Sequence, residues 1–66
     1  MAWGANLRAA RKRAGFKTQA ELASALGCTR AAVNAWERGI RAPSFHHRAA
    51  IAELLRRNPA RLFPAA

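Results

Sequence analysis

Residues 19–39, which read QAELASALGCTRAAVNAWERG, consist of two alanine-rich stretches separated by Gly27 and closed by Gly39. Alanine and leucine favour helix, and glycine favours the left-handed conformation in which many helices end. Thr18 precedes the first stretch and Glu21 follows three residues later, which is the spacing of a capping box. The segment therefore predicts two short helices joined by a tight turn, the first of which begins after Thr18.

The second of these helices, from about residue 29 to about residue 38, has two unlike faces. At about 100° per residue, one arc holds packing side chains and the opposite arc holds polar and small ones. The packing arc contains Thr29, Ala32, Val33 and Trp36, and the opposite arc contains Arg30, Ala31, Asn34, Ala35 and Arg38. Small side chains allow close approach of the backbone, and arginine and asparagine can pair with guanine and adenine edges. The opposite arc suits a major groove, although this helix alone fits an ordinary solvated surface equally well.

The rest of the chain also predicts helices, at about residues 3–14, 44–56 and 58–63. Ser44 and Asn58 are expected to cap the last two, and Pro59 fits the first helical position. The helix after Ser44 carries the apolar residues Phe45, Ala49, Ile51, Ala52 and Leu55. No strand pattern or repeat is visible. The expected fold is all-α, a compact bundle of four to five short helices in a single domain over residues 1–66.

The charge balance restricts the class of partner. The 66 residues include 12 Lys+Arg and 3 Asp+Glu, which gives a net charge of +9. A chain this basic favours a polyanion: nucleic acid most commonly, or an anionic membrane surface or an acidic protein. No apolar run approaches the roughly 20 residues of a membrane span, and the sole cysteine, Cys28, excludes an intramolecular disulfide. We therefore expect a cytoplasmic protein.

Catalytic and metal-binding patterns are missing from the sequence. It has no aspartate, its three glutamates are scattered, and no nucleophile has an orienting base, so an enzyme is not expected. His46 and His47 point about 100° apart on a helix and cannot hold one metal ion as an i, i+4 pair can. Cys28 is expected to be a small buried turn residue. No metal and no cofactor is expected.

From Gln19 onward the chain resembles the helix-turn-helix signature of the Cro/phage-repressor, or xenobiotic-response-element (XRE), family of bacterial DNA-binding domains. Ala23 stands where the motif has a small residue at the helix crossing, and Gly27 stands at the turn. Val33 and Trp36 stand where apolar residues dock the second helix on the first. Outside the motif, LRAARKRAG is similar to the first helix, WERG and RAPS to the turn after the recognition helix, and IAELLRRNPARLF to the last two helices.

Two positions depart from the family pattern. One extra residue lies between Gly15 and Gln19, and Arg48 occupies a position where the family usually has leucine. We expect either that the Arg48 methylenes cover the core while its guanidinium reaches outward, or that it pairs with Glu37 or Glu53.

The resemblance implies a helix-turn-helix at about residues 18–38, with the recognition helix at about 29–38 in the major groove of double-stranded DNA. The implied base contacts are Gln19, Arg30, Ala31, Asn34 and Ala35. The implied phosphate contacts are Lys17, Thr18, Thr29, Arg38 and Arg41. Arg11 and Glu37 match positions that often form a buried ion pair in this family, so their implied role is structural.

The expected function is sequence-specific transcription regulation by a small Cro-like repressor, a restriction-modification controller or an antitoxin-type operator binder, encoded by a bacterium or phage and associated with the nucleoid. Two copies are expected on an inverted repeat, with dimer contacts near Leu54, Pro59 and Arg61. Because only three residues follow Phe63, no effector domain and no small-molecule effector are expected. A basic helical module that binds an anionic membrane surface or a protein partner remains the alternative.

Overall fold

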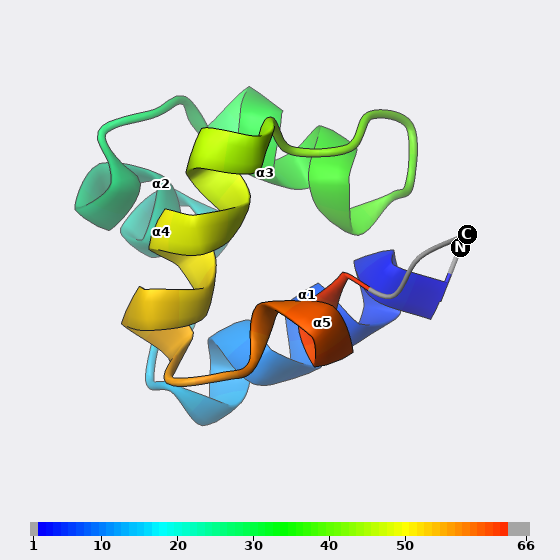
Figure 1. Ribbon diagram of the computed structural model, residues 1–66. Helices are drawn as coiled ribbons and strands as arrows, with labels where there is room; N and C mark the ends of the chain where they lie inside the picture. Colours follow the sequence, from blue (N-terminus) through cyan, green and yellow to red (C-terminus); the bar gives the residue numbers. More distant parts are fainter. Residues whose placement is uncertain (1, 64–66) are drawn as a thin grey trace.

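Five helices follow one another along residues 2–63, the part of the chain that the computed structural model describes (Figure 1). They are α1 (Ala2–Arg13), α2 (Gln19–Leu26), α3 (Arg30–Glu37), α4 (Phe45–Leu55) and α5 (Pro59–Leu62). α2 and α3 pack on each other, α1 packs on α3 and α5, and α4 contacts α2 and α5. No strand occurs within these residues. The expected all-α bundle of short helices is confirmed.

The N-termini of α2 to α5 are set by capping side chains that the sequence predicts. The Thr18 hydroxyl accepts from the backbone N–H of Glu21, whose carboxylate accepts from the Thr18 N–H, and this completes the capping box. Thr29, Ser44 and Asn58 each accept from a backbone N–H in the first turn of α3, α4 and α5. Each such cap stabilises its helix by about 1 kcal/mol, so local sequence fixes these boundaries.

The C-termini of α1 to α4 share one arrangement, in which a residue with positive φ directs two successive N–H groups back to the last turn. Gly15, Gly27 and Gly39 take this position after α1, α2 and α3, with φ of 95°, 73° and 74°. After α4 it is taken by Arg56, with φ of 54°, and the N–H groups of Arg56 and Arg57 donate to carbonyls at 3.2 and 2.9 Å. A side chain in this conformation costs about 1 kcal/mol relative to glycine.

The core forms where the helices meet. Its buried apolar members are Leu7, Ala10, Leu22, Ala23, Val33, Trp36, Ile51, Ala52, Leu55 and Leu62. Val33 and Trp36 therefore lie on the packing side of α3, as predicted. Among the apolar residues of α4, however, Phe45 is 85% exposed and Ala49 is exposed. The buried residues of α4, which are Ile51, Ala52 and Leu55, lie in its C-terminal half, whereas the Phe45 ring at its N-terminus is left in solvent.

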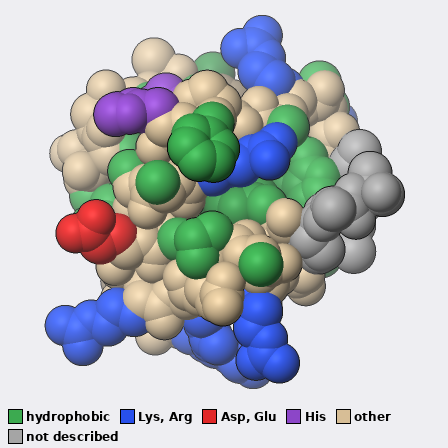
Figure 2. Space-filling model, viewed as in Figure 1, with side chains coloured by type: hydrophobic (Ala, Val, Ile, Leu, Met, Phe, Trp, Pro, Cys, Tyr) green, Lys and Arg blue, Asp and Glu red, His purple; other side chains and the backbone are tan. Residues whose placement is uncertain are grey.

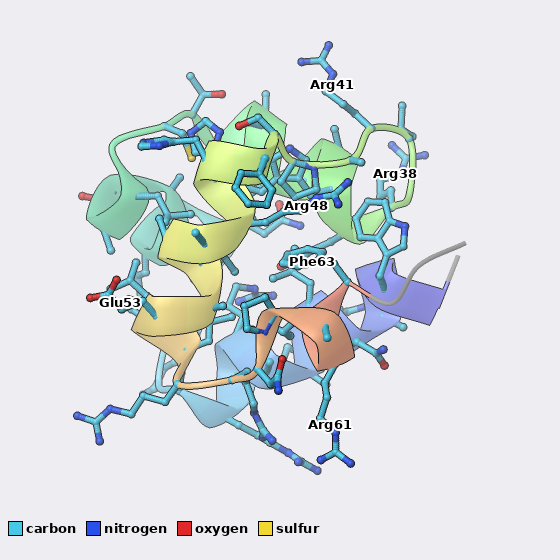
Figure 3. The ribbon with its side chains drawn as sticks, viewed as in Figure 1. Arg38, Arg41, Arg48, Glu53, Arg61 and Phe63 are labelled. Atoms are coloured by element: carbon cyan, nitrogen blue, oxygen red, sulfur yellow. The ribbon has the colours of Figure 1, made fainter. Side chains whose placement is uncertain are left out.

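Arg48 makes neither of the ion pairs considered for it. Its Nε donates to the Pro43 carbonyl at 3.1 Å, and its guanidinium carbon lies 5.7 Å from the centroid of the Phe63 ring (Figure 3). Phe63 also neighbours Trp3, whose ring centroid is 6.1 Å from that of Phe63. Arg48 is half-buried without a carboxylate partner. The Pro43 carbonyl and the face of the Phe63 ring interact with its positive charge instead.

α1 and the end of α3 are joined by two buried contacts. The Arg11 guanidinium pairs with the Glu37 carboxylate at 2.6 Å, with 4% and 3% of the two side chains exposed. About two turns earlier in α1, a Cβ added to Gly4 would lie 2.6 Å from the backbone oxygen of Glu37. The ion pair agrees with the family resemblance, whereas nothing in the sequence pattern predicted the close approach at Gly4.

Candidate nucleic-acid interface

The four α3 residues predicted to contact bases lie on the side of the helix away from the core. Arg30 and Ala31 are exposed, and Asn34 and Ala35 are half-buried. The intervening Val33 is fully buried. Arg30 and Asn34 are one turn apart on this side, and the small side chains of Ala31 and Ala35 beside them leave room for another molecule to approach the helix backbone.

Gln19 lies beside this face, because α2 packs on α3. Its Nε2 donates to Asn34 Oδ1 and to Glu37 Oε1, both at 3.2 Å. These contacts use both amide hydrogens, so Gln19 keeps only its Oε1 acceptor for an outside partner. An acceptor can meet a base donor but not a phosphate oxygen, so the free group of Gln19 suits a base contact and not a phosphate contact.

The cap residues of α2 and α3 keep donors of their own. Thr18 and Thr29 each accept a backbone hydrogen bond of 3.1 Å through the hydroxyl oxygen, which leaves each O–H free to donate. The backbone N–H of Lys17 donates to Glu21 Oε1 at 2.6 Å. The N–H groups of Lys17, Thr18 and Glu21 are therefore already used and cannot hold an anion at this edge, whereas the two hydroxyls and the Lys17 ammonium remain able to donate.

The remaining predicted cations extend from the C-terminal end of α3. Arg38 is its C-cap residue, and Arg41 lies in the following loop and points away from the bundle (Figure 3). A hollow of about 370 Å³ lies between Arg38 and the first helix; it is lined by Arg8, Arg11, Gln19, Asn34, Glu37 and Arg38. Arg8 was not among the predicted residues. Its place one turn before Arg11 was the available signal, because Arg11 holds that side of α1 against α3.

The acidic groups near this surface are used internally. The Glu37 carboxylate accepts from Arg11 and Gln19, and the Glu21 carboxylate accepts from two backbone N–H groups. Neither carboxylate is left to neutralise the exposed Arg30, Arg38 or Arg41. The face made by α3 and the start of α2 therefore carries uncompensated positive charge.

The other groups weighed for chemistry are in structural surroundings. Cys28 packs against the core, and burial raises the pKa of its thiol, the opposite of what a reactive cysteine needs. The His47 ring lies 5.3 Å from Trp36 and 3.1 Å from the Ser44 hydroxyl. Within residues 2–63 no group of three His, Cys, Asp or Glu side chains could hold a metal ion. No helix of that range is long and apolar enough to cross a bilayer.

Comparison with known protein families identifies the family to which this arrangement of helices belongs. A family model described as helix-turn-helix matches residues 7–62, from within α1 to the last residue of α5. No curated protein and no solved structure gives a significant match. The match spans most of the chain, agrees with the α2–α3 pair, and supports double-stranded DNA as the partner over the membrane alternative. The chain belongs to the XRE-type, Cro/phage-repressor-like family of helix-turn-helix domains and is a DNA-binding transcription regulator.

Proposed function

We propose that this protein is a repressor or controller that binds an inverted-repeat operator as two copies, with α3 of each copy in the major groove. The exposed face of α3 carries the proposal, because Arg30 and Asn34 are presented beside Ala31 and Ala35 while the other face is buried. α3 has eight residues, so one copy reads few bases. A second copy supplies the remaining specificity.

The proposed base contacts follow from the donors and acceptors that each side chain retains. Arg30 has a free guanidinium fork, which suits the O6 and N7 acceptors of guanine. Asn34 has Oδ1 held by Gln19, so it offers Nδ2 as donor, and Gln19 offers Oε1 as acceptor. Ala31 and Ala35 let the helix approach closely and can meet a thymine methyl group.

Side chains around the edge of this face are the proposed phosphate contacts. They are Lys17, Thr18, Thr29, Arg38 and Arg41, to which the structure adds Arg8 as a candidate. Contacts of this kind fix the position of a protein on the duplex without reading its sequence. Arg38→Ala and Arg41→Ala should therefore weaken specific and non-specific binding alike.

The proposed contact between two copies lies on the face formed by α4 and α5. Apolar side chains surround a hollow there (Figure 2), which has a volume of about 250 Å³ and is lined by Phe45, Arg48, Ala49, Pro59, Ala60 and Phe63. Leu54, which is 38% exposed, lines a different hollow from Pro59. We therefore centre the dimer proposal on Phe45 instead of Leu54. A contact between copies that is confined to the surroundings of this hollow would bury little surface, so it would be weak until DNA aligns both copies.

Operator occupancy in this proposal depends on protein concentration and on competition for the site. The proposed place of action is the bacterial cytoplasm, at nucleoid or phage DNA. The short tail on which the expectation of no effector domain depended, residues 64–66, lies outside the described residues.

Selection of binding sites from random duplex DNA tests the proposal. We expect an inverted repeat with half-site centres about 34 Å, one helical turn, apart. Affinity for the selected site should fall with salt by about 0.9 log unit per log unit of salt for each phosphate contact. Salt-insensitive binding would contradict the DNA contacts, and a single asymmetric half-site with one bound chain would contradict the two-copy arrangement.

A further inference from the structure

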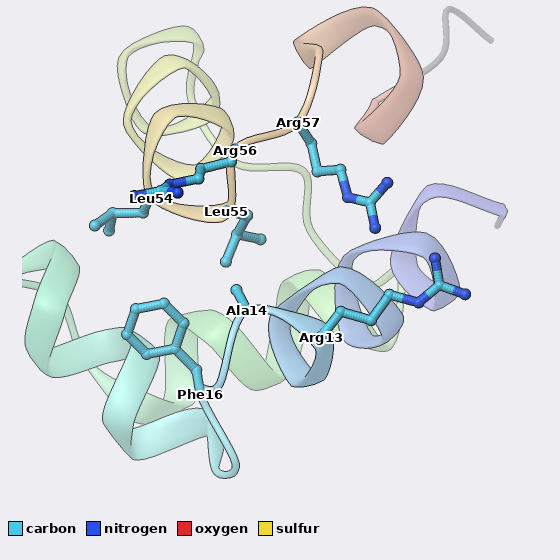
Figure 4. A pocket seen from close by; sticks show the side chains of 7 residues that line it. All are labelled: Arg13, Ala14, Phe16, Leu54, Leu55, Arg56 and Arg57. Carbon is cyan, nitrogen blue, oxygen red and sulfur yellow. The ribbon is translucent and has the colours of Figure 1, made fainter.

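A second hollow, of about 520 Å³, lies where the end of α1, the α1–α2 turn and the end of α4 meet (Figure 4). Its apolar lining is Ala14, Phe16, Leu54 and Leu55, and its charged lining is Arg13, Arg56 and Arg57. None of these residues belongs to the proposed DNA contacts. The volume falls in the range of about 300–1,000 Å³ that binding pockets occupy.

The charge at this hollow is uncompensated. Arg13, Arg56 and Arg57 are all exposed, and Figure 4 shows Arg13 and Arg57 on one side of the apolar lining and Arg56 beside Leu54. Among residues 2–63 the one ion pair is Arg11–Glu37, so none of the three cations has a carboxylate partner there. Three like charges around apolar side chains repel one another, and a ligand with carboxylates would relieve that repulsion.

The residue that ends α4 strengthens this observation. The three other helix ends of the same type use glycine, whereas this one places Arg56 in the left-handed conformation and directs its side chain to the hollow. Glycine would adopt the left-handed conformation at the end of α4 more easily than arginine does. Arg56 thus has a small conformational cost that glycine would avoid, and its side chain lines the hollow.

Two other occupants fit less well. A second copy of the chain in a two-fold contact would bring six arginines together at this hollow, because each copy contributes Arg13, Arg56 and Arg57. A DNA backbone would satisfy the cations but presents no apolar group to Phe16 and Leu54. A peptide that carries carboxylates on both sides of apolar side chains satisfies both parts of the lining.

The geometry points to a docking site for an acidic, apolar-centred peptide segment of a partner protein in the hollow between α1 and α4. The carboxylates pair with Arg13, Arg56 and Arg57, and the apolar side chains cover Phe16 and the exposed part of Leu54. Because the proposed DNA contacts lie on α3 and the start of α2, such a partner is a regulator that recognises the protein by a surface separate from DNA.

Fluorescence anisotropy with end-blocked, dye-labelled peptides tests this site on the whole chain at about 0.15 M salt, where long-range attraction is screened. The probe is EELFEE; EESSEE keeps its charge without the apolar centre, and QQLFQQ keeps the centre without the charge. We expect EELFEE to bind at least about tenfold more tightly than either control. Equal binding of EELFEE and EESSEE would show attraction by net charge alone and would overturn the site.

Matched variants locate the binding. Arg56→Glu with Arg57→Glu should weaken EELFEE binding about tenfold, whereas Lys12→Glu with Arg61→Glu, the same change of charge at two exposed residues outside the hollow, should change it less than about twofold. An equal loss in the variant with Lys12→Glu and Arg61→Glu would overturn the proposal. So would a loss of random-duplex binding in the Arg56/Arg57 variant as large as that in Arg38→Glu, since the hollow would then be a phosphate surface.

Arg56→Gly separates binding from folding. Glycine fits the left-handed backbone, so thermal unfolding should move to a higher temperature while EELFEE binding weakens severalfold. Leu54→Ser should reduce EELFEE binding to the level of EESSEE. If Arg56→Gly kept full peptide affinity and Leu54→Ser also left it unchanged, neither the charged nor the apolar lining would be in use and the proposal would fail.

Discussion

Gly4 places an unusual constraint on a single position of α1. Replacement of a helical glycine by alanine normally stabilises a protein by about 0.5–1 kcal/mol. Here the added Cβ would lie 2.6 Å from the Glu37 oxygen and 3.2 Å from the Trp36 oxygen, and both are backbone atoms. We expect Gly4→Ala to destabilise the fold by about 1–3 kcal/mol instead, measured by urea denaturation.

Ala9→Gly provides the matched control, because Ala9 is exposed on the same helix. It should cost about 0.5–1 kcal/mol through helix propensity alone. If Gly4→Ala left the free energy of unfolding unchanged or raised it, α1 would not be held against the backbone of α3.

Arg30 is the residue at which base reading and phosphate binding can be told apart. If it pairs with guanine, Arg30→Ala should cost about 1–3 kcal/mol at the selected operator and remove the preference at one base pair. The fold should be unchanged, because Arg30 is exposed. Binding is measured on operators that carry all four bases at each half-site position. Unchanged discrimination at every position would mean that Arg30 holds a phosphate.

At the scale of elements, the buried ion pair determines how α1 holds the end of α3. Glu37→Gln removes the charge that balances Arg11, whose side chain is 4% exposed. An unpaired buried charge costs about 3–5 kcal/mol, a large part of the stability of a small domain. We expect the urea concentration at the midpoint of unfolding to fall strongly. Circular dichroism during a urea titration measures this midpoint.

The double variant Arg11→Met with Glu37→Leu should recover most of that loss, because it leaves no charge buried. A Glu37→Gln cost below about 1 kcal/mol would show that the pair does not hold the two helices together.

Helix boundaries were predictable because the signals that set them are local. Thr18, Thr29, Ser44 and Asn58 all cap the helices assigned to them, and Gly27 ends α2 in the left-handed conformation. The two faces of α3 followed from its period, because its polar and apolar side chains are cleanly separated.

Contacts between elements were not predictable in the same way. The partners of Arg48 are Pro43 and Phe63, which depend on how α4 meets the preceding loop and α5. Exposure of Phe45 depends on where α4 leaves the core, and the Gly4 contact depends on the crossing of α1 and α3. For the site, the residue positions followed from the pattern, whereas the hydrogen bonds that limit Gln19 to an acceptor required the packed structure.

At the scale of the whole molecule, assembly on DNA should depend on Phe45. Phe45→Ser should leave stability within about 0.5 kcal/mol, because the ring is 85% exposed. Binding to the full inverted repeat should weaken about tenfold, which corresponds to loss of about 1.4 kcal/mol of contact between copies. Binding to a single half-site should be unaffected. Electrophoretic mobility shifts on the two DNAs measure both.

Leu54→Ser is the control for that experiment, since Leu54 is also an exposed apolar residue but lines the other hollow. Equal weakening by both substitutions on the inverted repeat would contradict a contact centred on Phe45.

The two tryptophans give the molecule two separate optical reporters. Trp36 is a buried residue of the recognition helix α3 and lies against His47 of α4, so its emission follows the docking of α3 on the core. Trp3 lies against Phe63, whose other neighbour is Arg48, so its emission follows the joining of α1, α4 and α5. A Trp3→Phe protein would report only the first event and a Trp36→Phe protein only the second. Time-resolved fluorescence of the two proteins could then show whether the packing of α3 or the packing of α1, α4 and α5 responds first when DNA is mixed with the protein.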